Sequence, residues 1–274
     1  MSSLTEQLHN DVFARAWVSR RGGLLQDDKA EEIAVRSYLA GAMPLRRRCA
    51  ADEAALVAAG MDALAAEYLE QEPEALVLNL GCGLDSRMLR VPHRGLWIDL
   101  DRPEVLELRR EYYEEDALAK MQGIEVMDFN WVAEIPYRGG PVLILAENAN
   151  LYLTESGLWG LILSARDRFQ STRLAADLLT TRAVRRELFR HPFRRNVPAA
   201  LWGVDGPEQV EDYAPGIRCV SRRSPASPEQ LESLPDDERK RLSRRLVREP
   251  EKAERCLYAF DIPGEKLFPR SKKK

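Results

Sequence analysis

The sequence lacks long apolar runs and carries little net charge. No segment approaches the roughly 20 consecutive apolar residues that a membrane-spanning helix needs. The start, MSSLTEQLHNDVF, carries acidic residues where a signal peptide has a basic and then an apolar stretch. The 41 Lys and Arg nearly balance the 44 Asp and Glu, so no overall field attracts nucleic acid. We therefore expect a cytoplasmic protein that binds neither membranes nor nucleic acid, and no sequence feature indicates an oligomeric state.

Cysteine is scarce and poorly placed for metal binding. The four cysteines are far apart, at Cys49, Cys82, Cys219 and Cys256. They form no C-x-x-C pair, and no histidine lies near them at the spacing of a metal site. This pattern predicts reduced thiols and no metal.

What is present is typical of a globular α/β protein. Apolar residues make up 45% and charged residues 31% of a 274-residue chain, enough for one large domain. In about the first seventy residues, apolar residues recur at spacings of three and four positions, which predicts helices. Short apolar runs then follow, typical of parallel strands buried on both faces. The predicted strands are ALVLNL (75–80), GLWIDL (95–100), GIEVMDF (123–129), PVLILAE (141–147) and RLAADLL (173–179).

Helices are predicted between these strands at 103–119 and 155–169, with Asp101 as a possible cap of the first. Near the end of the chain, IRCVSRRS (217–224) and ERCLYAFDI (254–262) read as strands that flank a charged helix at 228–248. Two such strands are expected to form an antiparallel pair at one edge of the sheet.

A glycine loop follows the first predicted strand in VLNLGCGLDSR. Gly81 and Gly83 lie where an open parallel sheet places its ligands, beyond the carboxyl ends of the strands. A dinucleotide fingerprint requires a third glycine, and Ser86 occupies that position, which argues against an NAD-dependent oxidoreductase. The alternative without a ligand is a tight turn capped by Asp85 or Ser86.

Acidic residues follow the next three predicted strands. Asp101 lies about twenty residues after the loop, where an acid can accept both hydroxyls of a ribose, unless it only caps a helix. Asp128 and Phe129 offer a carboxylate and an aromatic face for an adenine ring. Glu147 would be expensive to bury without a partner, and a cationic ligand would provide one. The acids therefore predict a positively charged nucleoside ligand.

These motifs together resemble the leucine carboxyl methyltransferase family, in particular its bacterial branch of tetracenomycin-type polyketide O-methyltransferases. The resemblance extends over about residues 10–260 and is carried by VLNLGCGLDSR, WIDLDRPEVLELRR, PVLILAENANLYL and LWGVDGPEQVEDYAPGIR. It implies the cofactor S-adenosylmethionine and an α/β, Rossmann-like class I methyltransferase fold. That fold has a seven-stranded, mostly parallel sheet with helices on both faces. Residues 1–72 would form a helical cover over a cofactor-binding domain at 73–274, as one compact unit.

The resemblance also implies roles for the matched residues around the cofactor. Gly81 and Gly83 would lie against its methionine part, and Asp101 would hold the ribose. Asp128 and Phe129 would flank the adenine. Glu147 would lie near the aminoacyl end.

Further matched residues concern the carboxylate of the cofactor and the acceptor. Arg46, in an R-x-R segment, would reach the cofactor carboxylate. Arg15 would lie near the cofactor or the acceptor, and Tyr152 would either bond the acceptor or pack in the core. The sequence departs from the common segment AEGLLMYL, which reads AENANLYL here. Asn148 and Asn150 are therefore expected on the acceptor side.

The chemistry of the acceptor can be considered independently. The sulfonium methyl group is already activated, so transfer mainly requires alignment and a nucleophile in the right ionic form. A carboxylate is ionised at neutral pH, whereas a phenol usually needs a general base such as histidine. His9, His93 and His191 all lie away from the glycine loop and the fourth strand in sequence. A carboxylate of a small metabolite is therefore favoured and a phenol remains possible.

Two other functions remain open at this stage. A protein C-terminal carboxyl methyltransferase would need a groove wide enough for a peptide end. A catalytically degenerate protein that only binds the cofactor would agree with the changed AENANLYL segment.

Overall fold

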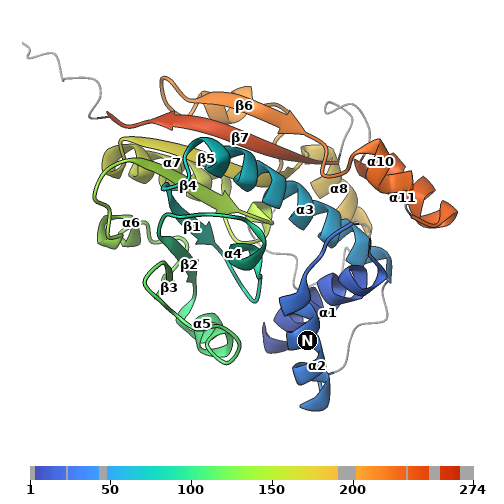
Figure 1. The fold of residues 1–274 in the computed structure, drawn as a ribbon. Helices are drawn as coiled ribbons and strands as arrows, with labels where there is room; N and C mark the ends of the chain where they lie inside the picture. Colours follow the sequence, from blue (N-terminus) through green and yellow to red (C-terminus); the bar gives the residue numbers. More distant parts are fainter. Residues whose placement is uncertain are drawn as a thin grey trace, which may run out of the picture.

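The computed structural model describes residues 4–22, 24–42, 48–190, 202–232, 234–246 and 254–265. These residues form one seven-stranded sheet with helices on both faces (Figure 1). The strands are β1 (Leu76–Leu80), β2 (Trp97–Asp101), β3 (Ala119–Gly123), β4 (Pro141–Ala146), β5 (Ser171–Leu179), β6 (Arg218–Arg223) and β7 (Arg255–Pro263). The longer helices are α1 (Leu4–Arg21), α2 (Asp28–Leu39), α3 (Arg48–Gln71), α7 (Glu155–Arg168), α8 (Thr181–Arg190) and α11 (Asp236–Leu246). The shorter ones are α4 (Arg87–Arg90), α5 (Pro103–Arg109), α6 (Trp131–Glu134), η1 (Ala149–Leu151), α9 (Glu208–Glu211) and α10 (Pro228–Glu232).

The strand order is β3-β2-β1-β4-β5-β7-β6. Strands β1 to β5 pair in parallel, and β7 runs antiparallel to both β5 and β6. The expected antiparallel pair at one edge is therefore confirmed. The chain builds outward from β1 to β3 and then returns to place β4 on the other side of β1. An open parallel sheet binds its ligands at such a reversal, beyond the carboxyl ends of the strands.

Helices cover both faces of the sheet, and neighbouring residues of each strand point to opposite faces, so both sets of side chains are buried. Leu76, Leu78 and Leu80 of β1 join a core with α6 and α7, whereas Val77 packs toward α3. Strands β4, β5 and β7 show the same division between the two cores. Strands buried on both faces carry apolar residues at nearly every position, and for this reason the apolar runs predicted β1, β4, β5 and β7 correctly.

Strand β3 is an exception, because it spans Ala119–Gly123 and not 123–129 as predicted. Its residues pair in register with Trp97–Asp101 of β2. As an edge strand it is only partly buried, so AKMQG carries no apolar run. The more apolar segment that follows it attracted the prediction.

Two helix predictions were also too long. Helix α5 ends at Arg109 and not at residue 119, and its N-cap is Arg102, not Asp101. The predicted charged helix at 228–248 is divided into α10 and α11. Pro235 lies between them, immediately before α11, and a proline disfavours helical conformation in the residue before it.

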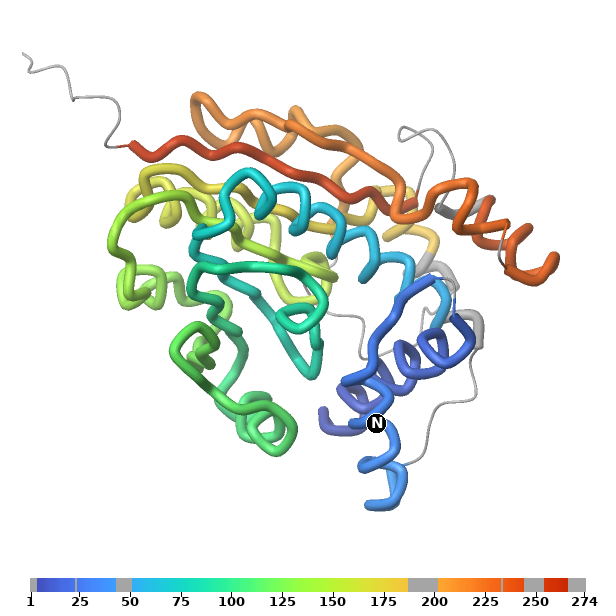
Figure 2. The backbone as a smooth tube through the Cα atoms, viewed as in Figure 1, coloured from blue at the N-terminus to red at the C-terminus, as the bar shows by residue number. Residues whose placement is uncertain are grey.

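The N-terminal helices lie over the end of the sheet where the glycine loop is found. Helices α1 and α2 pack on each other, and α1 also packs on α3. Figure 2 traces this N-terminal segment, in blue, beside the loop that follows β1. Helix α3 packs directly on the sheet through Val57, Met61 and Leu64. The division at residue 72 between a helical cover and a cofactor-binding domain stays a prediction.

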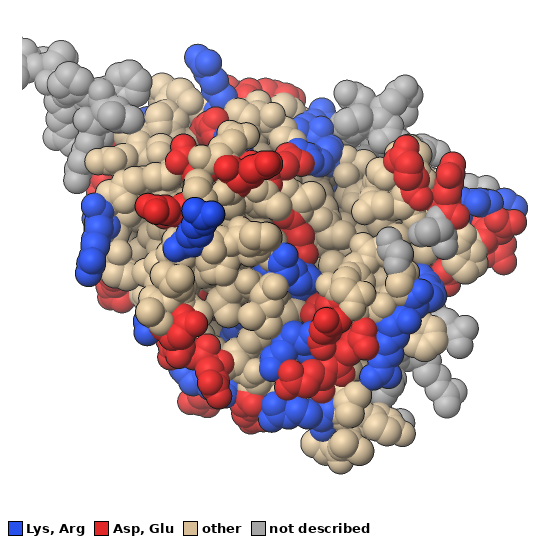
Figure 3. Space-filling model, viewed as in Figure 1, with Lys and Arg blue, Asp and Glu red and all other residues tan. Residues whose placement is uncertain are grey.

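The surface and the helices show two further properties. Acidic and basic side chains are mixed on the face shown in Figure 3. Among the described residues, no helix has the length and apolar character that crossing a membrane requires.

Candidate active site

A cavity of about 530 Å³ lies at the carboxyl ends of β1, β2 and β4, beneath α1. The predicted site residues that line it are Arg15, Gly81, Gly83, Asp101, Glu147 and Tyr152. The fold therefore brings these positions to one place, although they are spread over more than half of the chain. Arg46 lies outside the described residues.

The glycine loop needs glycine at both positions. Gly81 and Gly83 have positive φ angles of 66° and 49°. A Cβ added at Gly81 would lie 3.1 Å from the ring of Tyr152, and one at Gly83 would lie 3.2 Å from Leu8 of α1. The loop therefore combines left-handed backbone with close packing, both of which disfavour a larger residue.

Tyr152 packs against this loop from within the protein. Its hydroxyl donates to the backbone oxygen of Leu80 at 3.2 Å. Burial, together with the negative charge of Asp177, raises the pKa of Tyr152 well above its usual value. The hydroxyl therefore stays protonated at neutral pH. Contact with an acceptor remains a prediction for this residue.

Asp101 connects the end of β2 to the glycine loop. Its two carboxylate oxygens accept hydrogen bonds from the backbone N–H groups of Gly83 and Arg102, both at 2.8 Å. Burial raises the pKa of Asp101, and these two hydrogen bonds oppose the rise. Each carboxylate oxygen can accept a second hydrogen bond, so Asp101 can still receive two hydroxyls from the cavity.

Glu147 already has a cationic partner, contrary to the argument that a ligand must supply one. Arg87 of α4 donates a hydrogen bond to the Glu147 carboxylate. Burial raises the pKa of Glu147, whereas the charge of Arg87 lowers it. The sequence gives no local signal for Arg87, because this residue lies 60 residues away from its partner in the chain.

Among the described residues that line the cavity, acidic groups nevertheless outnumber basic groups. Its carboxylates are Asp11, Asp85, Asp101, Glu125 and Glu147, and its guanidinium groups are Arg15, Arg87 and Arg102. An excess of carboxylates favours a positively charged ligand.

Ser86, in the place of the third glycine, joins the loop to the N-terminal helices. Its hydroxyl donates to Asp27, which caps α2 by accepting from the N–H of Ala30 at 2.9 Å. Arg90 donates to the other carboxylate oxygen of Asp27 at 2.8 Å, and Arg15 forms an ion pair with it at 3.4 Å. The buried Asp27 therefore attaches α1 and α2 to the glycine loop.

The ion pair of Asp99 and Arg109 supports the glycine loop from the protein interior. Asp99 accepts hydrogen bonds from Asn79 at 2.8 Å, from Trp97 at 3.0 Å and from Arg109. Arg109 also donates to the backbone oxygens of Gly83 at 3.0 Å and Asp85 at 2.7 Å. Both members of this ion pair are buried, so they fix the backbone on which the ligand would lie.

The two asparagines of the AENANLYL segment have different environments. Asn148 lines the cavity and adopts a left-handed conformation with φ of 55°, which asparagine tolerates better than most residues. Asn150 is buried, donates to the backbone oxygen of Trp202 at 2.6 Å and accepts from the N–H of Leu179 at 2.7 Å. The expectation that Asn150 lies on the acceptor side is therefore wrong, because its side chain holds the fold.

Asp128 and Phe129 do not line the cavity, whereas Val126 and Met127 do. Asp128 is exposed and accepts a hydrogen bond from the N–H of Asn130 at 3.2 Å. The Phe129 ring packs closely on Gly160 of α7. Their contact with adenine remains a prediction.

Of the cysteines and histidines whose side chains the structure describes, only Cys82 lines the cavity. Cys82 is a buried thiol on the glycine loop, Cys256 is a buried thiol of β7, and Cys219 is half-buried; none of these three cysteines forms a disulfide. His9 lies beside Tyr112 and His93 beside Trp97, so neither lines the cavity. His191 lies outside the described residues. Among the residues the structure describes, no cluster of three or more His, Cys, Asp or Glu could hold a metal ion.

The sheet order and the site at its reversal define a class I methyltransferase fold. A DUF574 family protein from Streptomyces avermitilis aligns with a TM-score of 0.58 and 13% identity over 96% of this chain and 98% of its own. A putative methyltransferase from Thermobifida fusca aligns with a TM-score of 0.55 and 16% identity over 95% of this chain and 98% of its own. At this low identity, the two alignments support the fold alone.

The model of the leucine carboxyl methyltransferase family matches residues 2–202, and the chain belongs to this family. One relative is the tetracenomycin polyketide synthesis O-methyltransferase TcmP of Streptomyces glaucescens, 32% identical over 160 residues. Another is the S-adenosyl-L-methionine-dependent methyltransferase dpfgK of Gibberella zeae, 29% identical over 178 residues. These alignments cover 58% and 59% of this chain and 59% of each relative.

Proposed function

We propose that this protein is an S-adenosylmethionine-dependent O-methyltransferase that acts on a carboxylate of a small metabolite. The observation that carries the proposal is that Gly81, Gly83, Asp101 and Glu147 line one cavity. The chain also belongs to a methyltransferase family. The names of both relatives support methyl transfer, and one of them supports an oxygen acceptor.

The cavity residues fit this cofactor. Asp101 would accept the ribose hydroxyls through its remaining lone pairs, and the methionine part would lie along the glycine loop, which lines the cavity. Glu147 would hold the ammonium group, since opposite charges favour each other strongly in a partly buried site. The excess of carboxylates suits a ligand that carries both an ammonium and a sulfonium group.

The cofactor supplies a methyl group that is already activated by its positive sulfur. The protein must therefore align an acceptor oxygen with it and exclude water. Leu4 and Leu8 of α1 form part of the cavity wall and can exclude water. Arg15 also lines the cavity and would orient an anionic acceptor. A carboxylate is favoured because it needs no base, and no histidine of the described residues lines the cavity.

Methyl transfer can be tested with cofactor labelled in its methyl group and a panel of carboxylic and phenolic metabolites. We expect label in a carboxylic acid and its release by mild base, as for a methyl ester. Label that resists base would instead identify a phenol acceptor and contradict the carboxylate assignment. No transfer to any metabolite, together with transfer to a peptide C-terminus, would favour a protein substrate.

A further inference from the structure

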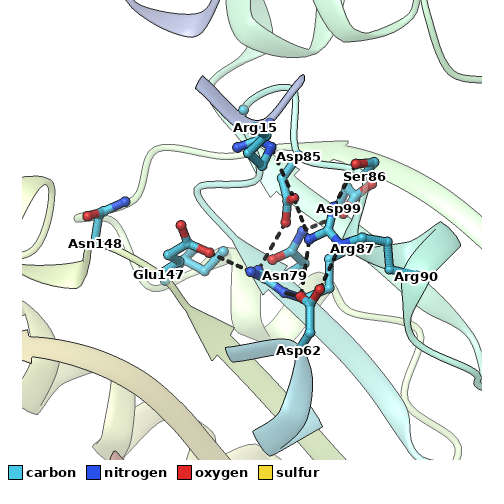
Figure 4. Close-up of polar contacts among 12 residues, drawn as sticks. Arg15, Asp62, Asn79, Asp85, Ser86, Arg87, Arg90, Asp99, Glu147 and Asn148 are labelled. Carbon is cyan, nitrogen blue, oxygen red and sulfur yellow. Dashed lines mark hydrogen bonds and ion pairs between the residues drawn. The ribbon is translucent and has the colours of Figure 1, made fainter. Parts of the chain in front are cut away.

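Arg87 is a buried cation that contacts three acids from three different parts of the fold. Its side chain is 1% exposed. Its Nε lies 2.7 Å from Asp62 of α3, one Nη lies 3.0 Å from Asp85 of the glycine loop, and the other Nη is bonded to Glu147 (Figure 4). A planar guanidinium held on three sides has one orientation, so the position of Glu147 is fixed with it.

The surroundings of Glu147 would otherwise disfavour its charge. Burial and the nearby Asp85 and Asp177 all raise the pKa of Glu147, and Arg87 is the cation that donates to it. Arg255 of β7 also acts on Glu147 by its charge, but its guanidinium donates to Asn148 and Asp177. The other charged groups among the described cavity residues are Asp11, Arg15, Asp101, Arg102 and Glu125, and Tyr152 is a further ionisable group there.

We propose that Arg87 is a positioning residue that keeps Glu147 ionised and directed into the cavity, where Glu147 binds the ammonium group of the cofactor. This inference rests on the proposed function. It assigns Arg87 an effect on the aminoacyl end of the ligand that differs from general support of the glycine loop.

A change in pH dependence follows from this role. Without Arg87, the pKa of Glu147 rises further, because burial and the neighbouring acids are no longer opposed. In the variant, Glu147 therefore becomes protonated at a higher pH than in the wild type, and a neutral carboxyl group holds an ammonium group poorly. Binding should therefore weaken at low pH and recover at high pH.

The experiment compares the wild-type protein with Arg87→Met by calorimetry from about pH 6 to about pH 8.5. The ligands are S-adenosylhomocysteine, which has the aminoacyl group, and 5′-methylthioadenosine, which lacks it. For the variant we expect S-adenosylhomocysteine to bind up to about tenfold more weakly for each unit of pH decrease. The wild type should change much less over this range. Affinity for 5′-methylthioadenosine should be alike in both proteins at every pH.

Three further variants separate the role of Arg87 from support of the fold. Arg87→Met combined with Glu147→Gln should lose the added pH dependence, because no carboxyl group is left to titrate there. Arg87→Lys should recover a flatter profile, because it keeps a positive charge. If Arg87→Met does not fold, Arg87→Gln replaces it, since glutamine retains a donor without charge.

Two results would overturn the inference. One is a pH profile of the uncharged Arg87 variant that runs parallel to that of the wild type. The other is an equal loss of affinity for 5′-methylthioadenosine, which would mean that Arg87 only supports the loop. If the wild type binds neither ligand, the proposed function itself is wrong.

Discussion

Asp101→Ala is expected to weaken binding of S-adenosylmethionine by about 100-fold or more. The substitution removes the carboxylate that would accept both ribose hydroxyls, and hydrogen bonds to a charged group contribute roughly 1.5–3 kcal/mol each. It also leaves the N–H groups of Gly83 and Arg102 without their acceptor, so the unliganded protein should melt earlier. The dissociation constant from calorimetry is therefore the measurement to compare.

Asp167→Ala provides the matched control for this variant. Asp167 is an exposed acid on α7 and does not line the cavity. Its removal should leave the dissociation constant within about twofold of the wild-type value. An unchanged affinity in Asp101→Ala would show that another group holds the ribose.

Of the substitutions proposed for this protein, Arg109→Met is expected to lower the free energy of unfolding the most. The change leaves the Asp99 carboxylate buried without its cation and removes two hydrogen bonds to the glycine loop. Loss of one member of a buried ion pair costs about 3–5 kcal/mol. For a chain of this size, the thermal midpoint should fall on the order of 10 °C. Scanning calorimetry measures this directly.

The adjacent residue gives a control for Arg109. Arg110 is exposed and forms only a long contact with Glu115, so Arg110→Met should change the unfolding free energy by less than about 0.5 kcal/mol. Adding Asp99→Asn to Arg109→Met should recover part of the loss, because no charge is then buried alone. If Arg109→Met and Arg110→Met have the same thermal midpoint, the supporting role assigned to Arg109 is wrong.

The sequence allowed most of the sheet to be predicted, because burial on both faces leaves a continuous apolar run. Strands β1, β2, β4, β5 and β7 all carry such runs, and their predicted positions agree with the structure to within a few residues. The exception, β3, lies at the edge and is polar. Its position depends on pairing with β2, which no local pattern records.

The candidate site divides in the same way. Gly81, Gly83 and Asp101 follow strand ends at a recognisable spacing, and they line one cavity. Arg87 and Asp27 were missed because their partners lie far away in the chain and no local pattern links them. The same contacts explain why Glu147 is not the isolated acid that the sequence suggested.

The most direct test of the account is calorimetric titration of the wild-type protein with S-adenosylmethionine, S-adenosylhomocysteine and NAD. We expect both S-adenosyl compounds to bind, with one molecule of ligand for each chain, and NAD not to bind. Each compound that binds should also raise the thermal midpoint. Binding of NAD, or of none of the three, would contradict the assignment of this cavity to S-adenosylmethionine.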